Sequence, residues 1–488
     1  MKIHNTFKNK ISTLLSQEKG AILKPFGIGK SIALIYPNSY FIGMSNLGFQ
    51  TIYRISNEKD TIVCERSFWD FEKQITIENQ RNINEFDIIA FSVSYEMDYY
   101  NILRILRRGR IPLLRKDRDN NYPIIIAGGT AIGMNCRPLI DFIDLFFLGE
   151  AEEFIHYLSD NVINSKSKEE FLNYFSNQKG VFISDINDID DVEFSEVDLD
   201  KYSSYSQVVT PNTEFSDRHL IEISRGCPFN CKFCYTGYCY NKFRIRNVNI
   251  IKSLIDEGSQ ITNKLGIIGS AICSHPDINT ICEYALNKNL SISFSSLRIQ
   301  ELNPFIINVL KNSNQNTITI APEAGSERLR TFIGKEITTE KIFNIVEMVF
   351  ENDIINLKLY FMIGLPSEEF DDIEAIVELV KKIRGIMLKK CKSKGKLGKL
   401  ILNIGIFVPR PKTPFADEKV DNIKELKKKI DYLNENLRGL SNVQLRISSP
   451  YFAKVQELIT KGDKEVGQLF LKVLESDGNW RKVVKFSN

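Results

Sequence analysis

Short apolar runs of strand length alternate with stretches of helical period along most of this chain. The first series of apolar runs covers residues 31–37, 61–65, 86–92, 122–130 and 143–150. Stretches of helical period follow some of these runs, at residues 46–57, 99–108 and 152–158. Parallel strands need a long crossover, usually a helix, so the alternation predicts a parallel, doubly wound α/β sheet. Sheets of this kind bind ligands at the carboxyl ends of their strands.

A second series begins after residues 184–212, which are rich in Asp and Ser and are interpreted as a linker. Its predicted strands cover residues 220–224, 265–270, 290–296, 317–322, 357–363 and 400–408. Six strand–helix units of this length predict a partial, TIM-like (β/α)6 barrel with its chemistry at the carboxyl ends. The predicted order is a Rossmann-like domain (1–183), the linker (184–212), the barrel (213–420) and a mostly helical C-terminal cap (421–488).

Composition narrows the function classes. Lys and Arg number 64 against 61 Asp and Glu, and a net charge of +3 gives no global basic field for nucleic acid. Nucleic-acid binding is therefore not expected, although the Lys-rich residues 381–399 keep it open. The longest apolar runs have strand length, the N-terminal stretch lacks the apolar segment of a secretion signal, and nine cysteines suggest no disulfide framework. We expect a cytoplasmic protein with reduced thiols and no membrane span.

Three cysteines follow the first predicted barrel strand, in the segment RGCPFNCKFCYTGYC. Cys227, Cys231 and Cys234 have C-x3-C-x2-C spacing, and a tight turn at the adjacent glycine and proline lets such a loop surround one metal cluster. Three protein ligands leave one iron of a [4Fe–4S] cluster open, whereas closed clusters and structural zinc sites normally take four. Two alternatives stay open, namely a zinc site with Cys239 as fourth ligand and a redox pair of Cys231 and Cys234.

The cysteine spacing, with Phe233 before the third cysteine and Tyr235 after it, resembles the signature of the radical SAM superfamily. The resemblance implies a [4Fe–4S] cluster whose open iron binds the amino and carboxylate groups of S-adenosylmethionine (SAM). It also implies reductive cleavage of SAM to a 5′-deoxyadenosyl radical, with electrons from a reducing partner such as flavodoxin or ferredoxin.

Later strand ends are similar to the stretches with which this family binds SAM. Residues 267–271 (IIGSA) stand where the family has a Gly-Gly-Glu-like motif, but no Glu follows. The stretch YFMIGLPSEE resembles the family's G-x-I-x-G-x-x-E stretch beside the adenine, with Phe361 replacing the first glycine and Glu368 at the last position. The resemblance implies SAM contacts through Gly269, Ser270, Ser296, Arg298, Glu323, Arg328, Ile363 and Gly364.

Two of these side chains have a physical reason to face SAM. The Arg298 cation suits the SAM carboxylate. The Glu323 carboxylate, at the end of the fourth strand, suits hydrogen bonds from the ribose hydroxyls or the methionyl amine. Taken alone, either residue more often forms a surface ion pair, but their order along the strands after the cysteine loop favours SAM.

Stretches of the N-terminal domain such as IIIAGGTAIGMNCRPL and FLGEAEE resemble the cobalamin-binding module of cobalamin-dependent radical SAM enzymes. Gly128, Gly129 and Gly149 end predicted strands, where a missing side chain lets the backbone touch a large flat ligand. Ser92 and Glu96 flank the same edge and are expected to contact the corrin amides. The histidine motif that binds cobalt elsewhere is absent, so an α/β domain of this fold without cobalamin is the open alternative.

The predicted function is that of a radical SAM enzyme that abstracts hydrogen from an unactivated carbon and, with cobalamin bound, transfers a methyl group. No side chain is assigned as a catalytic acid or base, and no motif specifies a substrate. Modification of tRNA or protein without cobalamin and a non-catalytic iron–sulfur protein stay open. Methylthiolation is disfavoured, because those enzymes carry three N-terminal cysteines for a second cluster and only Cys64 and Cys136 are present here.

Overall fold

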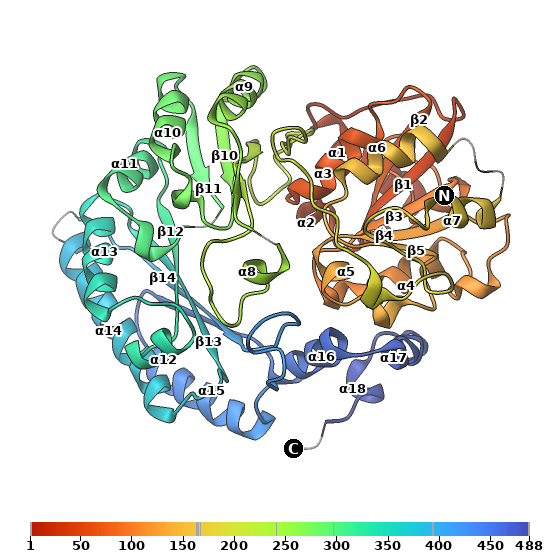
Figure 1. Ribbon diagram of the computed structural model, residues 1–488. Helices are drawn as coiled ribbons and strands as arrows, with labels where there is room; N and C mark the ends of the chain where they lie inside the picture. The colour runs from red at the N-terminus through yellow and green to blue at the C-terminus, as the bar shows by residue number, and fades with distance from the viewer. Residues whose placement is uncertain are drawn as a thin grey trace. The chain divides into compact units, whose positions relative to one another are not determined.

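The computed structural model describes residues 2–486 except 163, 164, 166, 241, 296, 393 and 394 (Figure 1). The chain forms two compact units. Unit 1 comprises Met1–Leu220 with Ile459–Lys485, and unit 2 comprises Ile221–Leu458 with Phe486–Asn488. Among the described helices, none combines the length and the apolar character needed to cross a lipid bilayer.

Unit 1 is built on a sheet whose described strands run in the order β2-β1-β3-β4-β5-β6. Their bounds are β1 Lys30–Tyr36, β2 Ile62–Phe68, β3 Ile88–Ser92, β4 Ile124–Gly128, β5 Leu145–Phe147 and β6 Val181–Phe182. The pairs from β2 to β5 are parallel, and β6 is antiparallel to β5. The order 2-1-3-4-5 is that of doubly wound, flavodoxin-like sheets, so the predicted α/β class of this domain is confirmed.

The strands of unit 1 are buried almost throughout, as expected for parallel strands covered by helices on both faces. The helices are α1 Lys2–Ser16, α2 Tyr40–Met44, α3 Leu47–Ser56, α4 Tyr99–Arg108, α5 Thr130–Met134, α6 Glu152–Asn161 and α7 Lys168–Phe175. Phe49, Phe68 and Phe154 belong to the core on one side of the sheet. Residues 184–212, predicted as a linker, are bound to unit 1, where Ser195 pairs with Gly149 and Val209 pairs with Lys19.

Unit 2 holds the second strand–helix series. Its strands form two hydrogen-bonded groups, in the orders β11-β10-β7 and β12-β13-β14-β15. Their bounds are β7 His219–Glu222, β10 Lys264–Ile268, β11 Ser291–Phe294, β12 Thr317–Glu323, β13 Asn356–Ile363, β14 Leu400–Ile406 and β15 Val443–Ile447. The six predicted strands are thus present. The seventh, β15, was not predicted, because its residues alternate between half-buried and exposed and form no apolar run.

The helices of unit 2 lie on the outer side of these strands, as in a partial barrel (Figure 1). They are α9 Val248–Ser259, α10 Ile278–Asn287, α11 Pro304–Asn312, α12 Glu327–Phe332, α13 Thr339–Glu351, α14 Phe370–Lys392 and α15 Ile423–Leu437. A short antiparallel pair, β8 Ser224–Arg225 and β9 Arg244–Ile245, brackets the cysteine loop and helix α8 Thr236–Cys239.

The C-terminal cap is mostly helical, as predicted. After β15 it contains α16 Pro450–Lys461, α17 Lys464–Glu475 and α18 Trp480–Val483. The residues from Ile459 to Lys485 belong to unit 1, although a cap on the barrel was expected. The segment that follows the barrel therefore contributes to the first unit.

Candidate functional site

The three predicted cluster cysteines lie on the loop between β8 and α8. Gly226 opens this loop with a φ of +80°, and a Cβ there would stand 2.6 Å from the carbonyl oxygen of Lys242, so glycine is required. The Cys234 N–H donates to the Cys231 carbonyl at 3.0 Å and closes a tight turn. Cys231 is buried, while Cys227 and Cys234 are partly exposed. One short loop therefore presents all three thiols.

The cysteine loop is held against the carboxyl ends of three barrel strands by Phe233. The Lys232 N–H donates to the Ile333 carbonyl at 2.9 Å, just after α12. Gly334 has a φ of +75°, and a Cβ there would stand 2.7 Å from the Asn230 carbonyl oxygen, so the loop and this turn lie in direct contact. Phe233 packs on a hydrophobic cluster drawn from the ends of β12, β13 and β14 and from α12, namely Ala324, Leu329, Ile333, Leu365, Phe407 and Phe415. This packing explains why an aromatic residue stands between the cysteines.

Arg298 lies beside the cysteine loop. Its Nη1 is 3.6 Å from Cys231 Sγ, and its guanidinium carbon lies 3.5 Å from the centre of the Phe229 ring. Burial raises the pKa of the Cys227 thiol, and the Arg298 cation opposes that rise. Arg298 was predicted to pair with the SAM carboxylate, and the structure places it on a cysteine sulfur.

The end of β10 is shaped by two serines. Ser295 Oγ accepts from the Gly269 N–H and donates to the Gly269 carbonyl, both at 3.2 Å. A Cβ at Gly269 would stand 2.7 Å from Ser224 Oγ, so a side chain here would require this hydroxyl to turn away. Ser270 follows and is partly exposed, while Ser296 lies outside the described residues. Ser295 was missed by the sequence analysis, because nothing in the sequence links it to Gly269.

Glu323 stands at the end of β12 with a φ of +70°. Its Oε1 accepts from Lys335 Nζ at 2.7 Å, and both side chains are largely buried. This ion pair fixes the carboxylate at the strand end, and no sequence signal marked Lys335 as its partner. Arg328, on α12, is engaged elsewhere, because its Nη2 pairs with Asp372 and donates to the Ser367 carbonyl. Contact of Arg328 with SAM stays a prediction.

The turn after β13 is closed by a buried carboxylate. Gly364 has a φ of +75°, and its N–H donates to Glu368 Oε2 at 2.7 Å. Lys429 Nζ bonds the same oxygen at 2.7 Å, and this cation opposes the rise that burial causes in the Glu368 pKa. Ile363 is buried, and its carbonyl accepts from the Phe407 N–H at 2.9 Å. Glu368 therefore shapes the glycine turn.

Two of the three glycines predicted to face cobalamin in unit 1, Gly129 and Gly149, face protein backbone. A Cβ at Gly129 would stand 2.5 Å from the Val93 carbonyl oxygen, and a Cβ at Gly149 would stand 2.3 Å from that of Ser195. Both glycines have a φ of +108°. Gly128 lacks such a constraint, because its nearest neighbour would be at 3.6 Å. The close approach of the chain to itself therefore accounts for Gly129 and Gly149 without a ligand.

The two side chains predicted beside the corrin lie at the same edge. Ser92 is half-buried at the end of β3, and Glu96 is buried four residues later. Glu96 Oε1 accepts from Thr460 Oγ1 at 3.1 Å. Its carboxylate therefore contacts the C-terminal segment of the same unit. At the positions predicted for cobalamin, Gly129, Gly149 and Glu96 do not fit this group.

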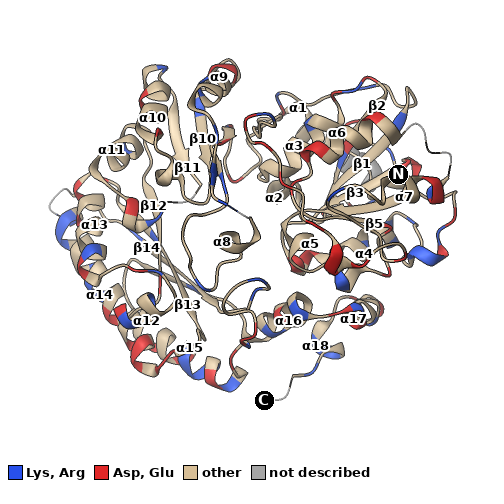
Figure 2. Cartoon of the chain, in the orientation of Figure 1, with Lys and Arg blue, Asp and Glu red and all other residues tan. Residues whose placement is uncertain are grey.

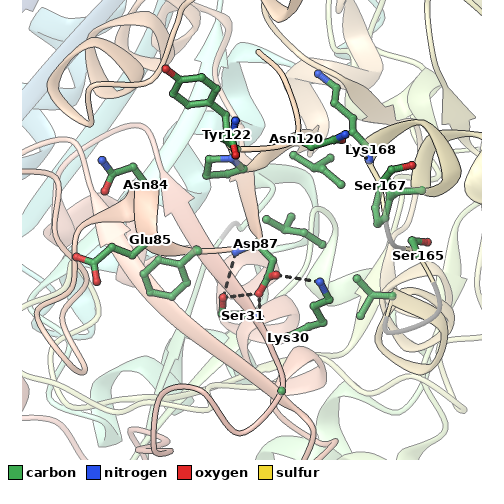
Figure 3. Close-up of a pocket in the computed structure, with 18 of the residues that line it drawn as sticks. Lys30, Ser31, Asn84, Glu85, Asp87, Asn120, Tyr122, Ser165, Ser167 and Lys168 are labelled. Carbon is green, nitrogen blue, oxygen red and sulfur yellow. Dashed lines mark hydrogen bonds and ion pairs between the residues drawn. The ribbon is translucent and has the colours of Figure 1, made fainter.

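A polar pocket of about 360 Å³ opens at the opposite, amino-terminal edge of the same sheet (Figure 3). Its lining includes Lys30, Ser31, Asp87, Tyr122, Ser167 and Lys168. Figure 3 shows Lys30 and Ser31 turned toward Asp87, which accepts from Lys30 Nζ at 2.9 Å and from Ser31 N and Oγ at 2.9 and 2.8 Å. The Asp87 carboxylate is thus occupied by contacts within the protein, and doubly wound sheets bind their ligands at the other edge.

Comparison with known families agrees with the cysteine loop. Residues 48–184 match the family described as "Radical SAM proteins, N-terminal", and residues 221–380 match the "Radical SAM superfamily". An uncharacterized protein of Methanocaldococcus jannaschii is 30% identical over 446 residues, which cover 90% of each chain. This chain belongs to the radical SAM superfamily.

Two further relatives of this radical SAM protein carry functional names. An uncharacterized methyltransferase of Pyrococcus horikoshii is 27% identical over 34% of this chain and 37% of its own length. The tRNA-2-methylthio-N(6)-dimethylallyladenosine synthase of Pelagibacter ubique is 20% identical over 66% of this chain and 67% of its own length. The family and these relatives show that the radical SAM protein is an enzyme.

Membership of the radical SAM superfamily implies a [4Fe–4S] cluster and SAM. Within the described part of the chain, no three His, Cys, Asp or Glu side chains converge on a single-ion site. A cubane cluster needs a different arrangement of ligands, because each cysteine thiolate binds its own iron. The three cysteine sulfur atoms therefore stand further apart than the ligands of a single metal ion. Three thiols on one loop, with a cation beside Cys231, fit this donor set.

Proposed function

We propose that this radical SAM enzyme binds its [4Fe–4S] cluster through Cys227, Cys231 and Cys234 and uses SAM to abstract hydrogen from an unactivated carbon. When bound, the cluster supplies the electron that breaks the S–C5′ bond of SAM and releases the 5′-deoxyadenosyl radical. The observation that carries the proposal is the three-cysteine loop, held by Phe233 on the carboxyl ends of β12 to β14. Active sites of β/α barrels lie at this end of the strands.

The residues of the barrel bind and orient SAM in this proposal. The ion pair with Lys335 holds the Glu323 carboxylate at the end of β12, where it accepts hydrogen bonds from SAM hydroxyls or the amine. The Glu368 carboxylate fixes the Gly364 turn, which brings backbone close to the adenine. The apolar cluster under Phe233 keeps water from the rear of the loop. Flavodoxin or ferredoxin is the proposed electron donor.

Transfer of the methyl group of SAM to the substrate carbon, which leaves S-adenosylhomocysteine and a proton, is the proposed overall outcome. Its support is the similarity to the methyltransferase of Pyrococcus horikoshii, which spans about a third of each chain. Cobalamin, expected from the sequence as the methyl carrier, does not fit at Gly129, Gly149 and Glu96, three of the residues predicted to hold it. We therefore derive no step through cobalamin.

Modification of tRNA is the second candidate, favoured by the similarity to the methylthio synthase of Pelagibacter ubique. Two observations weigh against methylthiolation by a second cluster. Cys64 and Cys136 are both buried, and burial raises the pKa of Cys136 to about 12. In the Lys-rich end of α14, Lys390 pairs with Glu347 and Glu351. Figure 2 shows acidic and basic residues interspersed along α13 and α14.

The proposed function is tested by anaerobic reconstitution with iron and sulfide, followed by incubation with SAM and dithionite or reduced flavodoxin. We expect iron, sulfide and 5′-deoxyadenosine from the unmodified chain. The Cys227→Ala, Cys231→Ala and Cys234→Ala variants should lose all three. The matched control is Cys239→Ala, in α8, which should keep them. Cluster-loaded protein that makes no 5′-deoxyadenosine would defeat the proposal.

Methyl transfer needs a separate measurement. The reconstituted enzyme is incubated with SAM labelled in the methyl carbon, together with either total tRNA or a small-molecule extract. Label in a substrate fraction that depends on the three cysteines supports methyl transfer. The appearance of 5′-deoxyadenosine with no transferred label in either fraction favours a different radical reaction.

A further inference from the structure

The carboxyl edge of the unit 1 sheet is closed by protein contacts at its topological switch point. In a sheet of order 2-1-3-4-5 the loops after β1 and β3 diverge, and ligands bind between them. Here those loops are hydrogen-bonded to each other. Asn38 Nδ2 donates to Asp98 Oδ1 at 2.9 Å, and Asn101 Nδ2 donates to the Pro37 carbonyl at 2.9 Å. The opening that such folds use for a cofactor is thus bridged.

The next two loops along the edge also meet protein backbone. The Val93 N–H donates to the Gly128 carbonyl at 2.8 Å, and the Ala131 N–H donates to the Val93 carbonyl at 3.1 Å. Beyond β5, the Ser195 N–H donates to the Leu148 carbonyl at 3.1 Å, and the Glu150 N–H donates to the Ser195 carbonyl at 3.0 Å. The backbone of Val93 and of Ser195 thus lies directly against Gly129 and Gly149.

The C-terminal segment completes the edge through Asn135. Asn135 Nδ2 lies 3.3, 3.0 and 2.8 Å from the carbonyl oxygens of Ile459, Thr460 and Gly462. Carbonyls at the end of a helix lack partners within the helix, so one amide satisfies groups that would otherwise need water. Thr460 and Glu96 are only 1% and 2% exposed, and the hydrogen bond between them lies inside the unit.

Helix α17 extends this contact along unit 1. A Cβ at Gly467 would stand 2.7 Å from the Pro138 carbonyl oxygen, so the helix lies directly on that turn. Arg107 Nη1 donates to the Leu474 carbonyl at 3.3 Å. Tyr100 on α4 makes an edge-to-face contact with Trp480 at the start of α18, with ring centres 5.7 Å apart.

We propose that the segment Ile459–Lys485 is the built-in occupant of the carboxyl edge of unit 1, and that unit 1 binds this segment in place of a corrinoid. Glu96, which was expected to contact the corrin amides, holds the segment instead, and Asn135 holds it beside Glu96. Unit 1 then anchors the C-terminal end of the chain, while SAM chemistry needs only unit 2. The inference goes beyond the proposed function and does not depend on it.

The first test measures corrinoid binding to the full chain. The protein is produced in cells supplied with hydroxocobalamin, purified, incubated again with hydroxocobalamin and separated from free ligand by gel filtration. We expect no corrinoid absorbance above that of a protein without this fold. One corrinoid per chain would overturn the proposal. Neither outcome involves 5′-deoxyadenosine, so this test is separate from that of the proposed function.

The second test asks whether the segment is docked in solution. In a double-mutant cycle of Glu96→Ala and Thr460→Val, we expect a lowering of Tm in the double variant that is smaller than the sum of the single effects. Asn135→Ala should speed amide exchange in residues 464–475 about tenfold, as expected for one net hydrogen bond. The matched control is Asn121→Ala, whose exposed side chain bonds only Asp119 among the described contacts. Additive Tm effects together with unchanged exchange would overturn the proposal.

Discussion

The position of Arg298 predicts a role in setting the potential of the cluster. Its Nη1 lies 3.6 Å from Cys231 Sγ, so it donates a charge-assisted hydrogen bond to a cluster ligand. Reduction adds negative charge, which a nearby cation stabilises, and hydrogen bonds to the sulfurs set cluster potentials. Replacing the cation in Arg298→Gln should therefore make the potential more negative.

The size of the shift follows from the geometry. Unit charges about 4 Å apart interact by roughly 4 kcal/mol at an effective dielectric constant of about 20. The added electron is shared over the whole cluster, so we expect about a third of this value. A difference of about 1.4 kcal/mol between the two redox states corresponds to about 60 mV for one electron.

The assay is a redox titration of the reconstituted protein, followed by electron paramagnetic resonance without SAM. Arg298→Gln should titrate about 60 mV below the unmodified protein. Arg328→Gln is the matched control, because its guanidinium pairs with Asp372, and it should leave the potential unchanged. An unchanged potential in Arg298→Gln, combined with weaker SAM binding, would refute this reasoning and return Arg298 to the role expected from the sequence.

Asp98, Phe233 and Gly149 give three further predictions. Burial raises the pKa of Asp98 to about 7. Between about pH 4 and 7 the folded state therefore holds a proton that the unfolded state releases. The free energy of unfolding should fall by roughly 4 kcal/mol as the pH rises through this range. Asp98→Asn should remove this part of the pH dependence in thermal melts, and an unchanged slope would contradict it. Phe233→Ala should lower the free energy of unfolding by about 2 kcal/mol and reduce iron per chain after reconstitution, whereas Phe233→Leu keeps most of both. Gly149→Ala should lower the free energy of unfolding, measured by chemical denaturation, by at least about 2 kcal/mol, because φ is +108° and the new Cβ would meet backbone. An equal loss of stability in the control Gly128→Ala would contradict this account.

Strands with continuous apolar runs were predictable from the sequence. β1 and β3 are mostly apolar and buried along almost every residue, and such runs carry a signal that needs no knowledge of partners. β15 carries no such signal, because only alternate residues are even half-buried. The strands β1 to β5 of the first unit and six strands of the barrel were therefore found, whereas β6 and β15 were missed.

The site residues were predictable where the chemistry of the metal cluster fixes their spacing in the sequence. They were not predictable where residues far apart in the sequence come together in the fold. The three cysteines are marked by their spacing alone. Lys335 and Ser295, which hold Glu323 and Gly269, carry no mark in the sequence because their roles arise only when the barrel folds. The glycines Gly129 and Gly149 were identified as special, but the sequence did not reveal what fills the space above them.

The packing of Phe233 has a consequence for how the enzyme acquires its metal. In small zinc domains the site does not exist before the metal binds. The free energy of metal binding therefore drives folding, and removal of the metal denatures the chain. Here the cysteine loop has its own apolar anchor and its own backbone hydrogen bond to the turn at Ile333. Because these contacts involve no metal ligand, we expect the barrel to fold before the cluster is loaded and to stay folded when the iron is removed.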